Sequence, residues 1–408
     1  MQGWVQTPIG MEPERWTTWS GCRVVLAIVR TVTDAQRLMD SVVTLARDPR
    51  VQVVFTVAPA VFGGGVRRWL SGVGAVVVPW EQAVHTRFDL ALAASVGRDL
   101  DQVHAPVALF AHGVGFNKYT PALGHRRRDV LRGTYGLGRD GLVRGGRLVA
   151  ARIALAHTDE ERRLASAFPE ASHAARVIGD AAVDRILASL EHRDWCRSQL
   201  GLGEREHLVV AASTWGRASL LGSRAPVLHR MVAEAGRSGS RVALLVHPNV
   251  WAAHGIWQVR EWSRPWTEAG LILVPADAEW ASVLAAADGV VGDHGSTTVY
   301  ASLTGRPLAL ATDGHEDVDP ASPMGEALRS IPMVDEGGPI LERLLRDVTP
   351  REKETLASIA SRTTSHPGEF ACRTRTMLYE LLGLPEPDTD PAVRPLRPLG
   401  QDVRGNRS

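Results

Sequence analysis

The sequence has few of the residues that build disulfide frameworks, and it lacks long apolar runs. Its three cysteines, Cys22, Cys196 and Cys372, are far apart and form no CxxC pair, so neither a disulfide framework nor a structural zinc site is indicated. No apolar run approaches the roughly 20 residues of a membrane-spanning helix, and the N-terminus has no basic-then-apolar signal segment. We therefore expect a cytoplasmic protein, with peripheral attachment to the inner face of the membrane left open.

Lysine is almost absent, because Lys118 and Lys353 are the only two and the other basic residues are arginines. The formal net charge of +1 and the lack of a helix-turn-helix pattern argue against a nucleic-acid partner. Hydrophobic residues make up 44% of the chain and charged residues 22%, which is ordinary for a globular protein. A length of 408 residues predicts two to three domains.

Short apolar runs alternate with helical segments along most of the chain. Continuous apolar runs are typical of parallel strands covered on both faces, and they occur at residues 23–29, 51–57, 107–111, 208–212, 242–246 and 289–292. Two such series predict an α/β protein with two Rossmann-like parallel-sheet domains facing across a cleft. We expect five parts: an N-terminal arm (1–20), an N-terminal domain (21–190), a C-terminal domain (191–345), helices packing back across both domains (346–384) and a disordered tail (385–408).

One turn in the second series has the composition of an anion site. A buried strand ends at Gly292, and a helix start follows, made of Asp293, His294, Gly295, Ser296, Thr297 and Thr298. Helix starts expose unbonded N–H groups and the positive end of the helix dipole, so they bind phosphate readily. The alternative is an ordinary capped helix. Gly305 and Pro307 end this helix.

Reactive side chains also follow other predicted strands, where open α/β sheets bind their ligands. His112 and Gly113 follow the run at 107–111, and a neutral imidazole there could act as a general base. Lys118 could meet an anion, or it could simply be solvated. Thr214 and Trp215 follow the run at 208–212, and His247 follows the run at 242–246.

Two familiar patterns occur in the wrong context. Residues 136–141 satisfy GxGxxG, but no strand precedes them, so we do not expect a nicotinamide cofactor. Residues 317–319 read Asp-Val-Asp, but they lie in a loop rich in Gly, Asp and Pro. We predict neither a metal site nor a cofactor.

Four segments together resemble the CDP-glycerol glycerophosphotransferases. Residues 111–113 with Lys118 are similar to that family's Trp-His-Gly…Lys turn, and residues 177–186 to its Gly-Asn-Pro…Asp-Arg-Leu segment. His247-Pro248 matches its His-Pro pair after a strand. Residues 293–296 take the place of its Asp-Tyr-Ser-Ser turn and are followed by the same Gly-Arg-Pro exit. The resemblance covers roughly residues 105–312 and implies a GT-B-like fold.

The resemblance implies a transferase that moves a glycerophosphate or glycosyl group from a nucleotide diphosphate, CDP-glycerol or an NDP-sugar, to an acceptor hydroxyl. Ser296 and Thr297 would hold the phosphates, and His247 would neutralise the leaving group. His112 would deprotonate the acceptor, and Thr214 and Trp215 would lie near the base or ribose. No metal would be required. A lipid-linked acceptor of the cell envelope and a homo-oligomeric state both stay open.

Two alternatives accompany this interpretation. A UDP-N-acetylglucosamine 2-epimerase-like enzyme would share the fold, but the acidic residues such enzymes use are not identifiable in the sequence. A non-catalytic nucleotide-binding protein is the other alternative. It is motivated by Ala111, which stands where the family has tryptophan.

Overall fold

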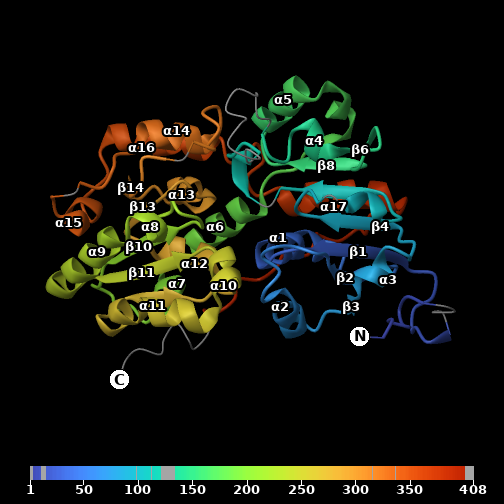
Figure 1. The fold of residues 1–408 in the computed structure, drawn as a ribbon, viewed down its shortest axis with the longest axis horizontal. Coiled ribbons are helices and arrows are strands. Elements are labelled where there is room, and N and C mark those ends of the chain that lie inside the picture. Colours follow the sequence, from blue (N-terminus) through green and yellow to red (C-terminus); the bar gives the residue numbers. More distant parts are fainter. Residues whose placement is uncertain are drawn as a thin grey trace. The chain divides into compact units, whose positions relative to one another are not determined.

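The computed structural model describes residues 3–10, 15–97, 99–111, 113–120, 134–314, 316–335 and 337–399 (Figure 1). The chain forms two compact units. Unit 1 comprises Met1–His112, Gly133–Ala181 and Ser365–Arg394, and unit 2 comprises Gly113–Arg132, Ala182–Thr364 and Pro395–Ser408. None of the helices in the described part of the chain has the length and apolar character needed to cross a bilayer.

Unit 1 is built on a parallel sheet whose seven described strands have the order β3-β2-β1-β4-β5-β8-β9. These strands are β1 (Arg23–Val29), β2 (Val51–Val57), β3 (Val77–Val78), β4 (Leu90–Ala93), β5 (Val107–Phe110), β8 (Arg152–Leu155) and β9 (Ala175–Val177). The longer helices of the unit are α1 (Val32–Val42), α2 (Val66–Val73), α5 (Thr158–Ala167) and α17 (Phe370–Leu382). The N-terminal arm is held where the backbone of Val5 exchanges two 2.7 Å hydrogen bonds with the side chain of Gln82.

Unit 2 is built on a second parallel sheet with the order β12-β11-β10-β13-β14. Its strands are β10 (Leu208–Ser213), β11 (Arg241–Val246), β12 (Ile272–Val274), β13 (Gly289–Gly292) and β14 (Leu308–Leu310). Successive residues of β10 enter different cores: Val209 packs in the cluster on one face, and Val210 in the cluster on the other. Burial on both faces explains why these strands are continuous apolar runs.

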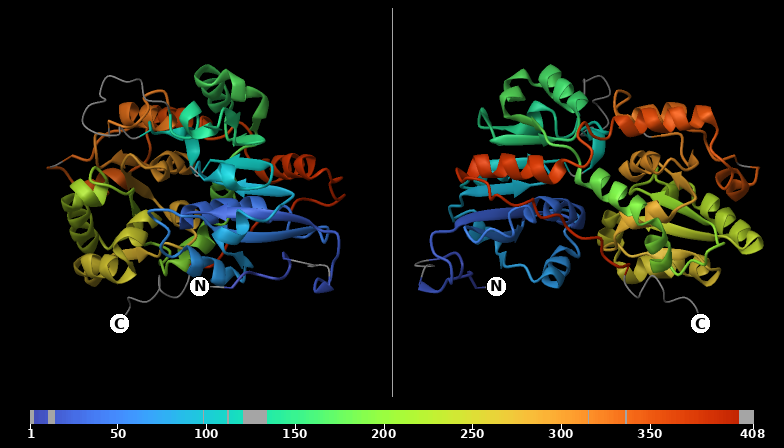
Figure 2. Two further views of the ribbon diagram at one scale, coloured as in Figure 1. Left: turned by 45° about the vertical axis from the view of Figure 1, so that its right-hand side comes forward. Right: turned by 180° about the vertical axis from the view of Figure 1, so that it is seen from behind.

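Helices flank this second sheet in Figure 1. They are α6 (Ala181–Glu191), α7 (Arg193–Gln199), α8 (Leu220–Ser223), α9 (Ala225–Ser238), α10 (Pro248–His254), α11 (Ile256–Glu268), α12 (Trp280–Ala286), α13 (Ser296–Ala301), α14 (Pro323–Ser330), α15 (Ile340–Leu344) and α16 (Pro350–Ser361). Figure 2 shows α14 and α16 lying together in this unit.

The strand order of unit 2 reverses between β10 and β13. The chain places β11 and β12 on one side of β10, and then returns to place β13 and β14 on the other side. In open α/β sheets, the carboxyl ends of the two strands at such a reversal flank the crevice where ligands bind. The switch point of unit 2 therefore lies between the residues that follow β10 and those that follow β13.

The unit boundaries differ from those that the sequence predicts. Nearly all of α6 joins unit 2, because its Val183 and Ile186 pack in the same cluster as Leu208 of β10. The helices expected at 346–384 divide between the units, with α16 in unit 2 and α17 in unit 1. Residues 113–120, which we expected in the N-terminal domain, also belong to unit 2.

Residues 385–399, where the sequence predicts a disordered tail, have a defined and irregular course. Arg394 forms a 3.0 Å ion pair with Asp40 of α1, within unit 1. Leu399 is 1% exposed and packs in the apolar cluster of unit 2. Residues 400–408 of the predicted tail lie outside the described residues.

One charged contact fastens α17 to the body of unit 1. The hydroxyl of Tyr379 donates a 2.6 Å hydrogen bond to Asp48, and the guanidinium of Arg50 forms a 2.6 Å ion pair with the same carboxylate. The bond from Arg50, opposed by burial and aided by Tyr379, holds the pKa of Asp48 well below its usual range. The ionised form of Asp48 is therefore the form that joins the C-terminal helix to the sheet.

This contact predicts a pH-dependent loss of stability in an Asp48→Asn variant. Because the folded pKa is depressed, the contribution of Asp48 is complete above the unfolded pKa of about 3.9 and is lost as the pH falls toward the folded value. Urea unfolding at several pH values should show a gap between wild type and variant that is constant near neutrality and narrows below about pH 4. Asp101→Asn, at an exposed aspartate of the same unit, is the control. A gap that does not change with pH would contradict the assignment.

Candidate functional site

The switch point of unit 2 is organised by the carboxylate of Asp293, which directly follows β13. Asp293 is 1% exposed. One oxygen accepts hydrogen bonds from the backbone N–H groups of Thr214 and Leu220, each at 2.9 Å, and the other accepts from Gly295 at 3.0 Å. The carboxylate therefore ties the loop after β10 to the turn after β13.

Glycine at position 295 permits this close approach. A Cβ atom there would lie 2.9 Å from Cβ of Thr214, which is closer than real Cβ contacts allow. Burial raises the pKa of Asp293, while the three N–H donors and the ammonium of Lys118 act in the opposite direction. Both oxygens are already occupied, so Asp293 shapes the site by positioning its two loops.

The three predicted hydroxyls after Asp293 separate into two groups. Ser296 and Thr297, in the first turn of α13, are half-buried. Thr298 is fully buried, and its hydroxyl donates a 2.6 Å hydrogen bond to the carbonyl of Asp293. His294 is also buried. Ser296 and Thr297 are therefore the hydroxyls with access to the switch point, whereas Thr298 stabilises the turn from inside.

The loop after β10 brings Thr214 and Trp215 to the same edge of the sheet. Thr214 is buried and bound to Asp293 through its backbone. The indole of Trp215 is 42% exposed. An exposed aromatic ring at the ligand-binding edge of a sheet can stack on a planar group such as a nucleobase.

His247 follows the neighbouring strand β11, and its tautomer is determined by a helix cap. Its backbone N–H donates a 3.0 Å hydrogen bond to the carbonyl of Ser213, which places it beside the end of β10. Its Nδ1 accepts a 3.1 Å hydrogen bond from the N–H of Asn249 in the first turn of α10. A nitrogen that accepts a hydrogen bond carries no proton, so the proton of the neutral ring is on Nε2.

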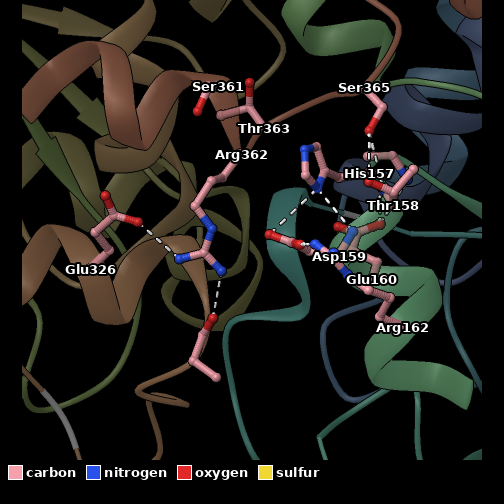
Figure 3. A network of polar contacts seen from close by, with 12 residues as sticks. His157, Thr158, Asp159, Glu160, Arg162, Glu326, Ser361, Arg362, Thr363 and Ser365 are labelled. Atoms are coloured by element: carbon pink, nitrogen blue, oxygen red, sulfur yellow. Dashed lines mark hydrogen bonds and ion pairs between the residues drawn. The ribbon is translucent and has the colours of Figure 1, made fainter. Parts of the chain in front are cut away.

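Unit 1 contains the same kind of cap at His157, before α5. The Nδ1 of His157 accepts a 3.0 Å hydrogen bond from the N–H of Asp159, as drawn in Figure 3. However, Asp159, Glu160 and Glu161 occupy the first turn of α5, whereas the first turn of α10 has no acidic residue. An anion would be repelled at His157 but not at His247.

Gly113 and Lys118 reach the switch point from a distant part of the sequence. A Cβ atom on Gly113 would lie 3.6 Å from the hydroxyl oxygen of Ser296. The ammonium nitrogen of Lys118 lies 5.8 Å from the centre of the Trp215 ring. Burial lowers the pKa of Lys118, opposed by attraction to Asp293 and Asp317. His112, the predicted general base, lies outside the described residues.

The Asp-Val-Asp triplet at 317–319 has a structural use. The carbonyl of Asp317 accepts a 2.7 Å hydrogen bond from the N–H of Tyr119. The carboxylate of Asp319 accepts from the N–H of Ala321 at 2.9 Å and from the Tyr119 hydroxyl at 3.2 Å. Within the described ranges, no three His, Cys, Asp or Glu side chains are grouped as metal ligands.

This chain is similar to solved structures of the wall teichoic acid polymerase TagF. Its H548A variant superposes with a TM-score of 0.60 and 12% sequence identity, covering 89% of each chain. Its H444N variant soaked with CDPG gives a TM-score of 0.59 with the same identity and coverage. A UDP-GlcNAc 2-epimerase from Methanocaldococcus jannaschii gives a TM-score of 0.47 at 9% identity, covering 88% of this chain and 99% of that chain.

No protein-family model matches the chain, and none of the curated proteins matches its sequence. The likeness to TagF therefore establishes the fold: this is an α/β protein of the GT-B-like class, as the sequence motifs predicted.

The position of Asp293 predicts a strong effect of Asp293→Ala on stability. Three buried backbone N–H groups would lose their acceptor, and an unsatisfied buried donor costs about 1–3 kcal/mol. We expect the free energy of unfolding of unit 2 to fall by at least about 2 kcal/mol in denaturant titrations. Asp313→Ala, which removes an exposed carboxylate after β14, should change it by less than about 0.5 kcal/mol. Equal effects of the two variants would contradict the role given to Asp293.

Proposed function

We propose that the chain is a metal-independent transferase that moves a glycerophosphate or glycosyl group from a nucleotide diphosphate donor to an acceptor hydroxyl. Trp215 and Ser296 follow the two strands that flank the switch point, and His247 lies beside the end of β10; this arrangement supports the proposal. The three residues supply an aromatic face, an Nε2–H donor and a hydroxyl at the start of a helix. A nucleotide diphosphate needs this combination, because it has one planar end and one anionic end.

In the proposed reaction, His112 takes the proton of the acceptor hydroxyl as the acceptor oxygen forms its new bond. With CDP-glycerol, the new bond is to the distal phosphorus, the pyrophosphate P–O bond breaks and CMP leaves. With an NDP-sugar, the new bond is to the anomeric carbon and the nucleoside diphosphate leaves. The negative charge that develops on the leaving group would be stabilised by Ser296, Thr297 and His247.

His247 would act in this step as a neutral hydrogen-bond donor. Protonation of its Nδ1 would remove the acceptor that caps α10, so the cationic ring would lose a contact that the neutral ring keeps. This differs from the cationic role that the family resemblance implies. The Nε2–H group can still stabilise developing charge, as a single positioned donor does in an oxyanion hole.

A nucleotide panel tests the donor class. Thermal-shift and calorimetric titration with CDP, UDP, GDP and CDP-glycerol should show binding, and we expect CDP and CDP-glycerol to bind most tightly. Ser296→Ala should weaken that binding about 10- to 150-fold, because a hydrogen bond to a charged group contributes about 1.5–3 kcal/mol. Ser330→Ala, at an exposed serine of the same unit, should bind as the wild type does.

Several outcomes would change the proposal. Binding without transfer to any hydroxyl in a cell-envelope lipid extract would favour the non-catalytic nucleotide-binding alternative. Release of free sugar and UDP from UDP-N-acetylglucosamine without an acceptor would favour the epimerase-like alternative. The absence of binding across the whole panel would refute the proposed function.

Substitutions of His247 separate its chemical role from its structural one. Asparagine is a good N-cap but cannot reach as far as Nε2, so His247→Asn should keep stability while transfer falls about 100-fold. His247→Ala should lose the same activity and about 1 kcal/mol of stability as well. His157→Asn, the matched change at the other histidine cap, should leave transfer unchanged. If His247→Asn retained full turnover, the donor role would be wrong.

A further inference from the structure

The structure assigns Lys118 to a different unit from the one that the sequence predicts. In sequence it follows β5, a strand of the unit 1 sheet, and we expected it in the N-terminal domain (21–190). In space, residues 113–120 are part of unit 2. The helical turn at Val114–Phe116 packs against α13, which begins with Ser296.

Backbone hydrogen bonds fasten this segment to the loop before α14. The carbonyl of Asn117 accepts a 2.8 Å hydrogen bond from the N–H of Asp319, and the N–H of Tyr119 donates to Asp317 at 2.7 Å. Lys118 and Val318, which lie between these two bonds, form an antiparallel bridge. The backbone of Lys118 is therefore held on both sides by residues about 200 positions further along the chain.

The side chain of Asn117 makes the turn rigid. Its amide nitrogen donates a 2.7 Å hydrogen bond to the carbonyl of Val114, and its oxygen accepts a 3.2 Å hydrogen bond from the N–H of Met324 in α14. Gly115 has a φ of +82°, and a Cβ atom there would lie 2.8 Å from Cδ of Pro323. Only glycine allows this backbone conformation at so close an approach.

Helix α14, which contacts the segment 113–120 through Asn117, is itself held in place by hydrogen bonds to Glu326. Glu326 accepts a 2.6 Å hydrogen bond from the hydroxyl of Ser358. It also accepts a 2.9 Å hydrogen bond from Arg362, as drawn in Figure 3. Arg362 also donates to the carbonyl of Ala321 at 2.6 Å. The contacts that hold the backbone of Lys118 in place therefore extend through α14 to α16.

The ammonium of Lys118 is half-buried in a place that has no matching anion. Among the described residues it forms no hydrogen bond and no ion pair, and it lies over the face of Trp215. Asp293 and Asp317 attract it from a distance, but both oxygens of Asp293 are occupied by backbone N–H groups. A partly buried cation without a close partner is unfavourable unless a ligand supplies the negative charge.

We infer that Lys118 binds the phosphate groups of the nucleotide donor as part of unit 2, and does not serve the acceptor. This inference rests on the proposed function and deepens it. The position of Lys118 over the Trp215 ring places the positive charge beside the surface proposed for the nucleobase. The donor site would then combine one cation from the segment 113–120 with the hydroxyls at the start of α13.

The scarcity of lysine makes a direct test practical. Periodate-oxidised CDP carries a ribose dialdehyde that forms an imine with a nearby lysine amine and releases water, and borohydride reduces that imine to a stable secondary amine. Peptide mapping of the labelled full-length chain should find the modification on Lys118, and excess CDP should protect it. Lys353, exposed on α16, is the internal control and should be labelled weakly and without protection.

Two substitutions complete the test. Lys118→Met should weaken CDP binding at least 10-fold, with an unchanged unfolding midpoint, whereas Lys353→Met should bind like the wild type. Lys118→Arg keeps the charge and should recover most of the affinity, which a purely structural lysine would not predict. In steady-state transfer, Lys118→Met should raise the KM for the donor and leave the KM for the acceptor unchanged.

The outcomes separate this inference from the function on which it rests. If CDP binds but Lys118→Met keeps wild-type affinity, or if label appears only on Lys353 or the α-amino group, the inference is wrong and the proposed function stands. If Lys118→Met raised only the KM for the acceptor, Lys118 would bind the acceptor and the inference would be wrong. If no nucleotide binds to the wild type, both proposals fail.

Discussion

The site depends on one buried carboxylate. Asp293 accepts three backbone hydrogen bonds from the two loops that flank the switch point of unit 2, and it thereby ties these loops together. A buried carboxylate is costly unless its oxygens are satisfied. The same three bonds that make its burial tolerable also hold Thr214 and Gly295 in place.

Charge at this edge is distributed in a way that favours an anionic ligand. The negative oxygens of Asp293 are turned toward the backbone, while the ammonium of Lys118 is held beside the indole of Trp215. The helix cap at His247 lacks the acidic first turn that surrounds His157. Two histidines with the same hydrogen-bond geometry therefore have different electrostatic surroundings.

The likeness to TagF supports the fold, whereas the geometry of the site supports the proposed function. At 12% identity the superposition establishes the arrangement of strands and helices, but it does not transfer an activity. The function is proposed from the chemistry at the edge of the unit 2 sheet, where an aromatic ring, an imidazole N–H and hydroxyls follow neighbouring strands, and the ammonium of Lys118 lies beside the aromatic ring. The proposed site lies at the edge of the sheet where such folds bind their ligands, and the role of the site residues can be tested independently of the fold.

The sequence by itself determined the local elements. Apolar runs specified strands buried on both faces. The residues Asp293, Gly295 and Ser296 marked the start of α13, and Gly305 marked the end of the helical turn that follows it. Only the tertiary structure decided that Thr298 turns inward, that α6 and residues 113–120 belong to unit 2, and that Leu399 is buried. Asn117 and Tyr119 gave no sequence signal, because their partners lie some 200 residues away. Periodicity and capping act over a few residues and can be read locally, whereas packing between distant segments depends on which surfaces the whole fold brings together.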